Sequence, residues 1–107
     1  MVGNLFKNGA NPLPQELSTV LAQSPHARVE QIVSDGHASP EGFWYDQEQD
    51  EWVLLVSGSA TLSIEIESTI ETVNLNPGDH LLIPAHRRHR VDSTSSIEKT
   101  IWIAIFL

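Results

Sequence analysis

Apolar and polar residues alternate strictly over 61–67, where Leu62, Ile64 and Ile66 are separated by Thr, Ser and Glu. This period of two is typical of a strand with one buried face and one solvent-facing face. Further short strands, bounded by turn-forming residues such as Asn-Pro-Gly-Asp at 76–79, are expected at 28–34, 42–46, 51–57, 70–75, 80–83, 88–92 and 98–107. The pattern predicts an all-β fold of antiparallel strands, either a closed barrel or a two-sheet jelly roll.

The segment before residue 28 carries a different pattern. Its apolar residues recur at helical spacing, at Leu13, Leu17, Val20 and Leu21. Pro14 suits the first turn of a helix, and Glu16 suits the helix dipole there. We therefore expect an irregular arm over 8–14 and a short N-terminal helix over 14–23. The predicted division is an arm and helix over residues 1–27 and a β-barrel domain over residues 28–107.

Length and composition narrow the possible functions. The chain has 107 residues, enough for one domain, and it has no cysteine. Its net charge is −8, from 14 acidic and 6 basic residues, which disfavours binding to nucleic acid or to an anionic membrane. No apolar run follows Lys7, and the longest apolar run, 101–107, is far shorter than the roughly 20 residues of a membrane-spanning helix. We expect a cytoplasmic protein.

Two stretches combine turn residues with side chains that can bind a ligand. Gly58 follows Glu51 by seven residues. Pro84 follows Gly78 by six residues, and His89 follows Pro84 by five. These spacings resemble the two conserved motifs of the cupin superfamily, and the resemblance covers about residues 28 to 107. It implies a small, single-domain cupin barrel of the jelly-roll type.

In cupins the usual metal ligands are three histidines and one glutamate that face into the barrel. The resemblance carries Glu51 and His89 over directly. The paired histidines of the first motif are absent, and their positions hold Trp44 and Asp46 or, with the shorter gap, Tyr45 and Gln47. Two protein ligands hold an ion weakly, so Asp46 and His86 are the candidates that would complete a metal site. Such nitrogen and oxygen donors suit Fe, Mn, Zn or Ni.

Three other residues are candidates for the lining of a ligand pocket. On a regular strand Trp44 shares a face with Asp46, and Arg87 shares a face with His89. Arg87 would then bind a carboxylate or a phosphate. His37, in a loop, would reach the mouth of the barrel. The structural alternatives are a core position for Trp44, a turn-capping role for Asp46 and solvated charges for the arginines.

Three functional hypotheses remain open. The first is a metal-dependent enzyme that acts on a small metabolite. The second is a module that binds a small molecule, an anion or a sugar, without metal and without catalysis. It is favoured by the missing histidine pair. The third is a homodimer in which the apolar segment 101–107 and the N-terminal arm provide an exposed edge.

Overall fold

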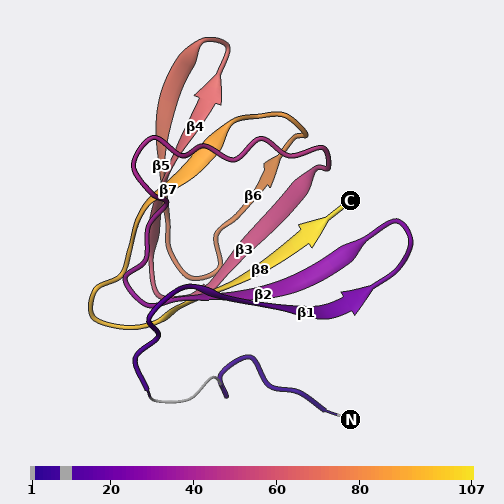
Figure 1. Cartoon of the computed structure of the whole chain (residues 1–107), viewed down its shortest axis with the longest axis vertical. Coiled ribbons are helices and arrows are strands. Elements are labelled where there is room, and N and C mark those ends of the chain that lie inside the picture. Colours follow the sequence, from indigo (N-terminus) through magenta and orange to yellow (C-terminus); the bar gives the residue numbers. More distant parts are fainter. Residues whose placement is uncertain (1, 8–10) are drawn as a thin grey trace.

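The computed structural model describes residues 2–7 and 11–107, and within them the chain forms eight strands in two antiparallel sheets (Figure 1). In chain order the strands are β1 (Leu17–Gln23), β2 (Arg28–Ser34), β3 (Glu51–Ser57), β4 (Ala60–Ile66), β5 (Thr69–Leu75), β6 (His80–Ile83), β7 (His89–Thr94) and β8 (Thr100–Phe106). The all-β prediction is confirmed. The arm expected over 8–14 lies partly outside the described residues, since these omit 8–10.

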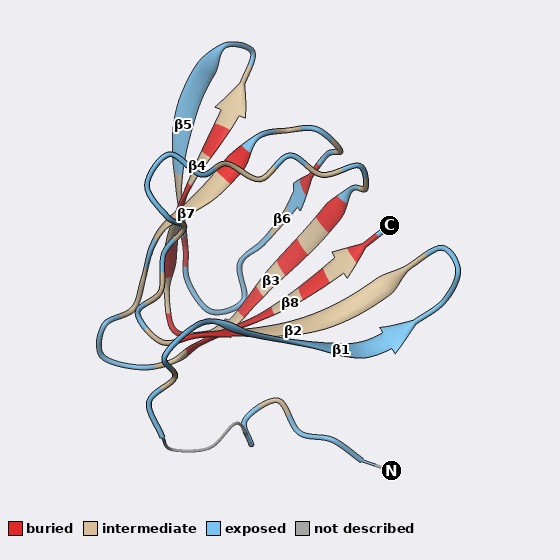
Figure 2. Cartoon of the chain, viewed as in Figure 1, coloured by how far each residue is buried: buried red, intermediate tan, exposed pale blue. Residues whose placement is uncertain are grey.

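One sheet has the strand order β1-β2-β8-β3-β6, and the other has the order β5-β4-β7. The core lies between them, because buried side chains come from both sheets. Its members are Val53, Leu55, Ala60, Leu62, Ile64, Leu75, Ile83 and Trp102. Buried and half-buried residues alternate along β3 and β4, as the period of two requires, whereas β1 is exposed throughout (Figure 2).

The predicted N-terminal helix is wrong. Residues 17–23 form β1, which pairs in antiparallel register with β2 from Leu17 opposite Val33 to Gln23 opposite Arg28. No helix occurs anywhere in the described part of the chain. Apolar spacing misled here because the apolar side chains of β1 are about half exposed and form no buried helical face. Backbone pairing with β2 outweighs a weak local preference for helix.

The segment expected to offer an exposed edge is also placed differently. Strand β8, which holds residues 100–106, lies between β2 and β3 and is hydrogen-bonded on both sides. The edge strands of the described sheets are β1, β6, β5 and β7. Residues 100–106 therefore offer no free strand edge to another chain in this structure, and dimerisation itself stays a prediction.

Two tight connections shape the fold, one between the two sheets and one within the three-stranded sheet. Gly58, between β3 and β4, has a φ of +87°, and a Cβ built on it would lie 2.4 Å from the Thr100 hydroxyl oxygen. Glycine is therefore required there by both conformation and space. The two-residue connection from β4 to β5 places Glu67 and Ser68 at positive φ, as in a type I′ hairpin turn.

The segment 42–46 does not form the strand that its aromatic residues suggest. Within it only Tyr45 makes a ladder contact, an isolated antiparallel bridge with His89. The described residues include no helix long and apolar enough to cross a membrane.

Candidate functional site

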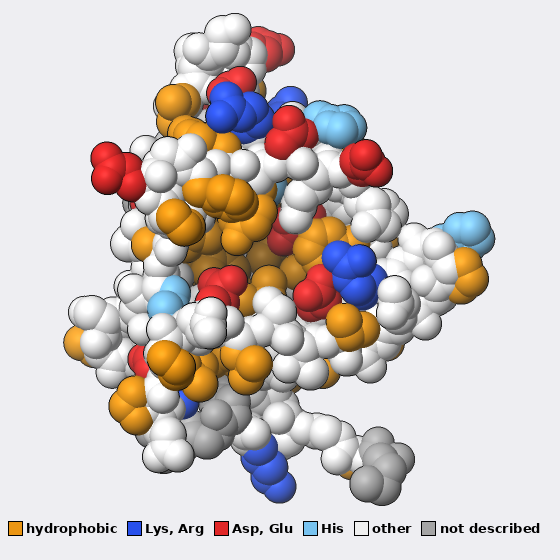
Figure 3. Space-filling view, viewed as in Figure 1, with side chains coloured by type: hydrophobic (Ala, Val, Ile, Leu, Met, Phe, Trp, Pro, Cys, Tyr) orange, Lys and Arg blue, Asp and Glu red, His pale blue; other side chains and the backbone are white. Residues whose placement is uncertain are grey.

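A cavity of about 250 Å³ opens between the two sheets, and side chains from seven strands and two connecting segments line it. They are Glu16, Ser18, Arg28, Glu30, Ile32, Tyr45, Gln47, Glu51, Val53, Leu62, Ile83, His89, Val91, Trp102 and Phe106. Figure 3 shows the hollow, with hydrophobic side chains deep inside it and charged side chains around it. An apolar floor with a few polar groups is typical of a small-molecule site.

Glu51 and His89 form the buried polar centre of this cavity. They begin β3 and β7, and their side chains are only 10% and 6% exposed. His89 Nε2 lies 3.6 Å from Glu51 Oε1, beyond hydrogen-bond distance. The Nδ1 of His89 donates to the Arg87 carbonyl at 2.9 Å, so the lone pair of the neutral ring is on Nε2. Neither Nε2 nor the Glu51 carboxylate is hydrogen-bonded to any residue in 2–7 or 11–107, so both are available to a ligand.

Tyr45 forms one wall beside this pair. Its ring stacks on the His89 imidazole with centroids 5.2 Å apart, and Phe43 packs edge-on against it at 4.9 Å. Two backbone hydrogen bonds, of 2.7 and 3.2 Å, join Tyr45 to His89. Burial raises the pKa of the Tyr45 phenol, and the negative charges of Glu16 and Glu51 raise it further. The phenol therefore stays protonated and can donate a hydrogen bond at neutral pH.

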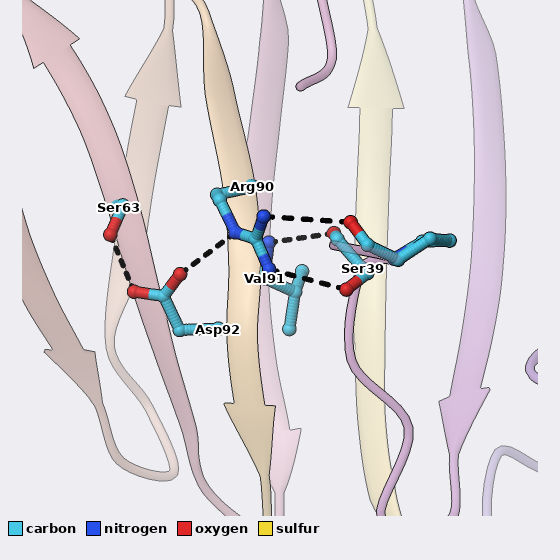
Figure 4. Close-up of polar contacts among 6 residues, drawn as sticks. Ser39, Ser63, Arg90, Val91 and Asp92 are labelled. Atoms are coloured by element: carbon cyan, nitrogen blue, oxygen red, sulfur yellow. Dashed lines mark hydrogen bonds and ion pairs between the residues drawn. The ribbon is translucent and has the colours of Figure 1, made fainter. Parts of the chain in front are cut away.

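Arg90 holds the loop that carries Tyr45 (Figure 4). Its guanidinium donates to the carbonyl oxygens of Ser39, at 3.2 Å, and Pro40, at 3.5 Å. Its Nε donates to Asp92 at 3.0 Å, and the Asp92 carboxylate also accepts from Ser63 on β4. The Ser39 hydroxyl accepts from the backbone of β7 at 3.0 Å. Arg90 is thus a structural residue that fixes the loop to β7.

Three further charged residues line the cavity: Glu16, Arg28 and Glu30. On β2, Arg28 Nε donates to Glu30 at 2.7 Å, and the guanidinium carbon lies 4.4 Å from the centre of the Phe106 ring. Glu16, just before β1, accepts a hydrogen bond of 2.9 Å from the buried Ser34 hydroxyl. That hydroxyl accepts in turn from the indole nitrogen of Trp102 at 3.1 Å. This relay fixes the Glu16 carboxylate.

The structure brings together only two of the four predicted metal ligands, Glu51 and His89. Asp46 and His86 lie outside the cavity lining and pair with each other at 2.8 Å. Their side chains are 52% and 66% exposed. His86 follows Pro84 in a turn with a φ of +63°, and Asp46 belongs to an irregular loop, so strand parity does not aim either side chain at Glu51.

The three predicted pocket residues also lie away from the cavity lining. The Trp44 ring faces Arg88, whose guanidinium carbon is 5.3 Å from its centre. Arg87 precedes β7 and gives its carbonyl, not its side chain, to the site. His37 Nδ1 accepts a backbone hydrogen bond from Asp35 at 2.9 Å.

Sequence reasoning missed Glu16, Arg28, Glu30, Tyr45 and Gln47 as cavity residues. Tyr45 and Gln47 occupy the two motif positions of the shorter gap, so the spacing already contained that signal. Arg28, Glu30 and Ile32 alternate along the inner face of β2. The sequence did not show which face of β2 points inward, because Val29 and Val33 make the opposite face apolar as well.

The donor set does not fit a metal held by protein ligands alone. Across residues 2–7 and 11–107 no group of three or more His, Cys, Asp or Glu side chains is arranged to hold an ion. Glu51 and His89 supply one oxygen and one nitrogen ligand, which is fewer than the three or more that protein metal sites ordinarily use.

Similar structures are known. A putative mannose-6-phosphate isomerase from Ralstonia eutropha JMP134 is 43% identical, with a TM-score of 0.89 over 99% of this chain and 96% of that chain. A cupin superfamily protein from Desulfitobacterium hafniense DCB-2 is 24% identical, with a TM-score of 0.73 over 92% and 82%.

A more distant match shares the fold alone. The hydroxypropylphosphonic acid epoxidase from S. wedmorenis is 11% identical, with a TM-score of 0.72 over 89% of this chain and 52% of that chain. An HppE structure that contains Fe(II) matches at the same identity. No protein-family model and no curated protein matches the chain.

Proposed function

The chain belongs to the cupin superfamily, and we propose that its cavity binds a small sugar-like metabolite. Glu51 and His89 would transfer a proton within that bound ligand. The observation that carries the proposal is the buried pair itself. A carboxylate and an imidazole nitrogen face one cavity at 3.6 Å from each other, and neither is hydrogen-bonded to a described residue. Both groups face the cavity with hydrogen-bonding capacity that no described residue uses, so a ligand that carries hydroxyl groups can bond to both.

The size and lining of the cavity support this class of ligand. About 250 Å³ accommodates a molecule of a few carbon atoms with its hydroxyl groups. Carboxylates accept hydrogen bonds from hydroxyls, and the protonated Tyr45 phenol donates one. The relative from Ralstonia eutropha, whose name includes an isomerase of a phosphorylated sugar, agrees with a sugar as the reacting group.

The pair has what an aldose–ketose interconversion needs. When it holds one proton besides that on His89 Nδ1, it presents one acid and one base to the ligand. The base takes the proton from the carbon next to the carbonyl, and the acid protonates the carbonyl oxygen, which gives an enediol. Return of the first proton to the neighbouring carbon and removal of the proton from the other hydroxyl give the ketose. The pair then has its original proton, so the cycle balances.

The test is proton exchange at carbon. We expect mannose or mannose 6-phosphate, incubated with the protein in D2O, to exchange its C2 proton for deuterium, as followed by proton NMR. Glu51→Gln and His89→Gln should each lower the exchange rate by at least about a hundredfold, the lower end for loss of a general acid or base.

The exposed Asp46–His86 pair provides matched controls. Asp46→Asn and His86→Gln should leave the exchange rate within about twofold, because neither side chain lines the cavity. Equal losses in both pairs would contradict the assignment of the site. Saturable binding of either sugar without exchange would identify the cavity as a binding module. Neither binding nor exchange of both sugars would refute the proposal.

A further inference from the structure

The charges that line the cavity are unbalanced. Three carboxylates line it, from Glu16, Glu30 and Glu51, against one guanidinium, from Arg28, and the imidazole of His89. The Arg28 charge is already engaged, because its Nε donates to Glu30 at 2.7 Å and its guanidinium lies over Phe106. A ligand between Glu16 and the buried pair therefore meets a net negative field.

Glu16 is held in a fixed place in that field. The carboxylate accepts from the Ser34 hydroxyl, and Ser34, with 0% exposed surface, accepts from Trp102 within the core. Rotation of Glu16 away from the cavity would break this relay. Ser18, which follows on β1, also lines the cavity, and both residues are exposed, so Glu16 lies at the solvent-exposed rim of the cavity.

We propose that the cavity takes an uncharged, hydroxyl-bearing ligand and that Glu16 is the specificity residue that disfavours a phosphorylated one. The inference rests on the proposed function, since it names the ligand class of the same site. Hydroxyl groups donate to the carboxylates of Glu16 and Glu51 and leave the Arg28–Glu30 pair intact. A phosphate monoester carries nearly two negative charges at pH 7, so it is repelled by these carboxylates and loses its hydration above an apolar floor.

The ligand proposed for this chain differs from the phosphorylated sugar in the name of the Ralstonia eutropha relative. The sequence-based expectation that Arg87 binds an anion does not apply to this cavity, because the Arg87 side chain does not line it. The carboxylates that do line the cavity favour ligands that donate hydrogen bonds over ligands that carry negative charge.

The experiment compares mannose with mannose 6-phosphate by isothermal titration calorimetry at low salt, on the wild-type chain and two charge-matched variants. Wild type should bind mannose at least about tenfold more tightly, since juxtaposed like charges repel each other. Glu16→Gln should reduce that ratio by about fivefold or more, mainly through tighter binding of the phosphorylated sugar. Glu71→Gln, which removes the same charge from exposed β5, should leave the ratio within about twofold. Added salt should reduce the wild-type ratio, because Glu16 is at an exposed position.

The possible outcomes separate the two proposals. Tighter wild-type binding of mannose 6-phosphate, lost in Glu51→Gln, would overturn this inference and leave the proposed function standing. Equal effects of Glu16→Gln and Glu71→Gln would also overturn it, because selection would then follow from net charge. Failure of both sugars to bind would refute the proposed function, and this inference with it.

Discussion

Among residues 2–7 and 11–107, two carboxylate–imidazole ion pairs have opposite surroundings. Asp46 and His86 meet at 2.8 Å on the surface, with side chains 52% and 66% exposed. Glu51 and His89 stand 3.6 Å apart inside a cavity, with side chains 10% and 6% exposed. The closer pair has the better hydrogen bond and water around it. The wider pair is largely shielded from solvent and no hydrogen bond joins its two members, although His89 Nδ1 donates to the Arg87 carbonyl.

The difference shows why a short distance does not mark a functional site. An exposed ion pair contributes about 0–1 kcal/mol to stability, and its groups satisfy each other. A buried pair that lacks good hydrogen bonds lowers the stability of the fold, because the free energy of desolvation is not recovered. Retention of such a pair beside a cavity is what a ligand-binding role requires.

The two pairs should differ most in their contribution to ligand affinity. Glu51→Gln should weaken the binding of mannose by at least about tenfold, since a hydrogen bond to a charged group contributes about 1.5–3 kcal/mol and a factor of ten corresponds to 1.4 kcal/mol. Asp46→Asn should leave the dissociation constant within about twofold. Titration calorimetry measures both, and a larger loss in Asp46→Asn would reverse the comparison.

The next effect is on stability. Replacement of the buried pair by Glu51→Leu and His89→Leu together should leave the free energy of unfolding unchanged or raise it by about 1–4 kcal/mol, because apolar groups suit the cavity floor better. Asp46→Ala with His86→Ala should lower it by at most about 1 kcal/mol. Urea unfolding followed by circular dichroism gives both values. Strong destabilisation by the double leucine variant would show that the buried pair supports the fold.

The titration of Tyr45 should show a smaller effect of the buried pair. It can be followed by absorbance without interference, because Tyr45 is the one tyrosine in the sequence. Burial and the charges of Glu16 and Glu51 raise its pKa above the usual 10.0, so its absorbance change near 295 nm should occur at a higher pH than in the unfolded chain. Glu51→Gln should lower that pKa, and Asp46→Asn should not change it. An equal shift in both variants would show that the phenol senses only net charge.

The raised pKa of Tyr45 should also make the stability of the fold fall at high pH. A folded pKa above the unfolded value means that the stability contributed by neutral Tyr45 is present below pH 10.0 and is lost as pH rises through the folded pKa. Tyr45→Phe should remove that loss. Unfolding midpoints measured between pH 9 and 11 test this, with wild type falling more steeply than the variant.

The smallest expected effect is that of metal removal. Two protein ligands bind an ion weakly, so dialysis against EDTA should leave the proton exchange rate and the melting temperature unchanged within error. The matching measurement is metal content by mass spectrometry. One ion per chain that disappears in both Glu51→Ala and His89→Ala would contradict this and restore the metal site expected from the family.

The sequence was informative where spacing and structure are regular. The period of two over 61–67 predicted β4, and the Asn-Pro-Gly-Asp turn placed β6. The spacings of the two motifs led to Glu51 and His89, because each begins a strand whose register is fixed by pairing. The cupin resemblance is confirmed by the comparison with known structures.

The rest depended on geometry that spacing does not encode. Asp46 was proposed because it stands at the position of a missing motif histidine, but the loop 42–50 pairs with β7 only at Tyr45. His86 adopts a positive φ, which turns its side chain away from the face of His89. Glu16 reaches the cavity only because its segment leads into a strand instead of the expected helix.

The relay from Glu16 through Ser34 to Trp102 joins the rim of the cavity to a chromophore in the core. A molecule that engages Glu16 changes the polarity felt by the indole N–H, and indole emission responds to that polarity. With Trp44 and Trp52 replaced by phenylalanine, Trp102 would be the single fluorescent indole. The emission wavelength of Trp102 would then report whether the cavity is occupied, without a label and without a coupled assay.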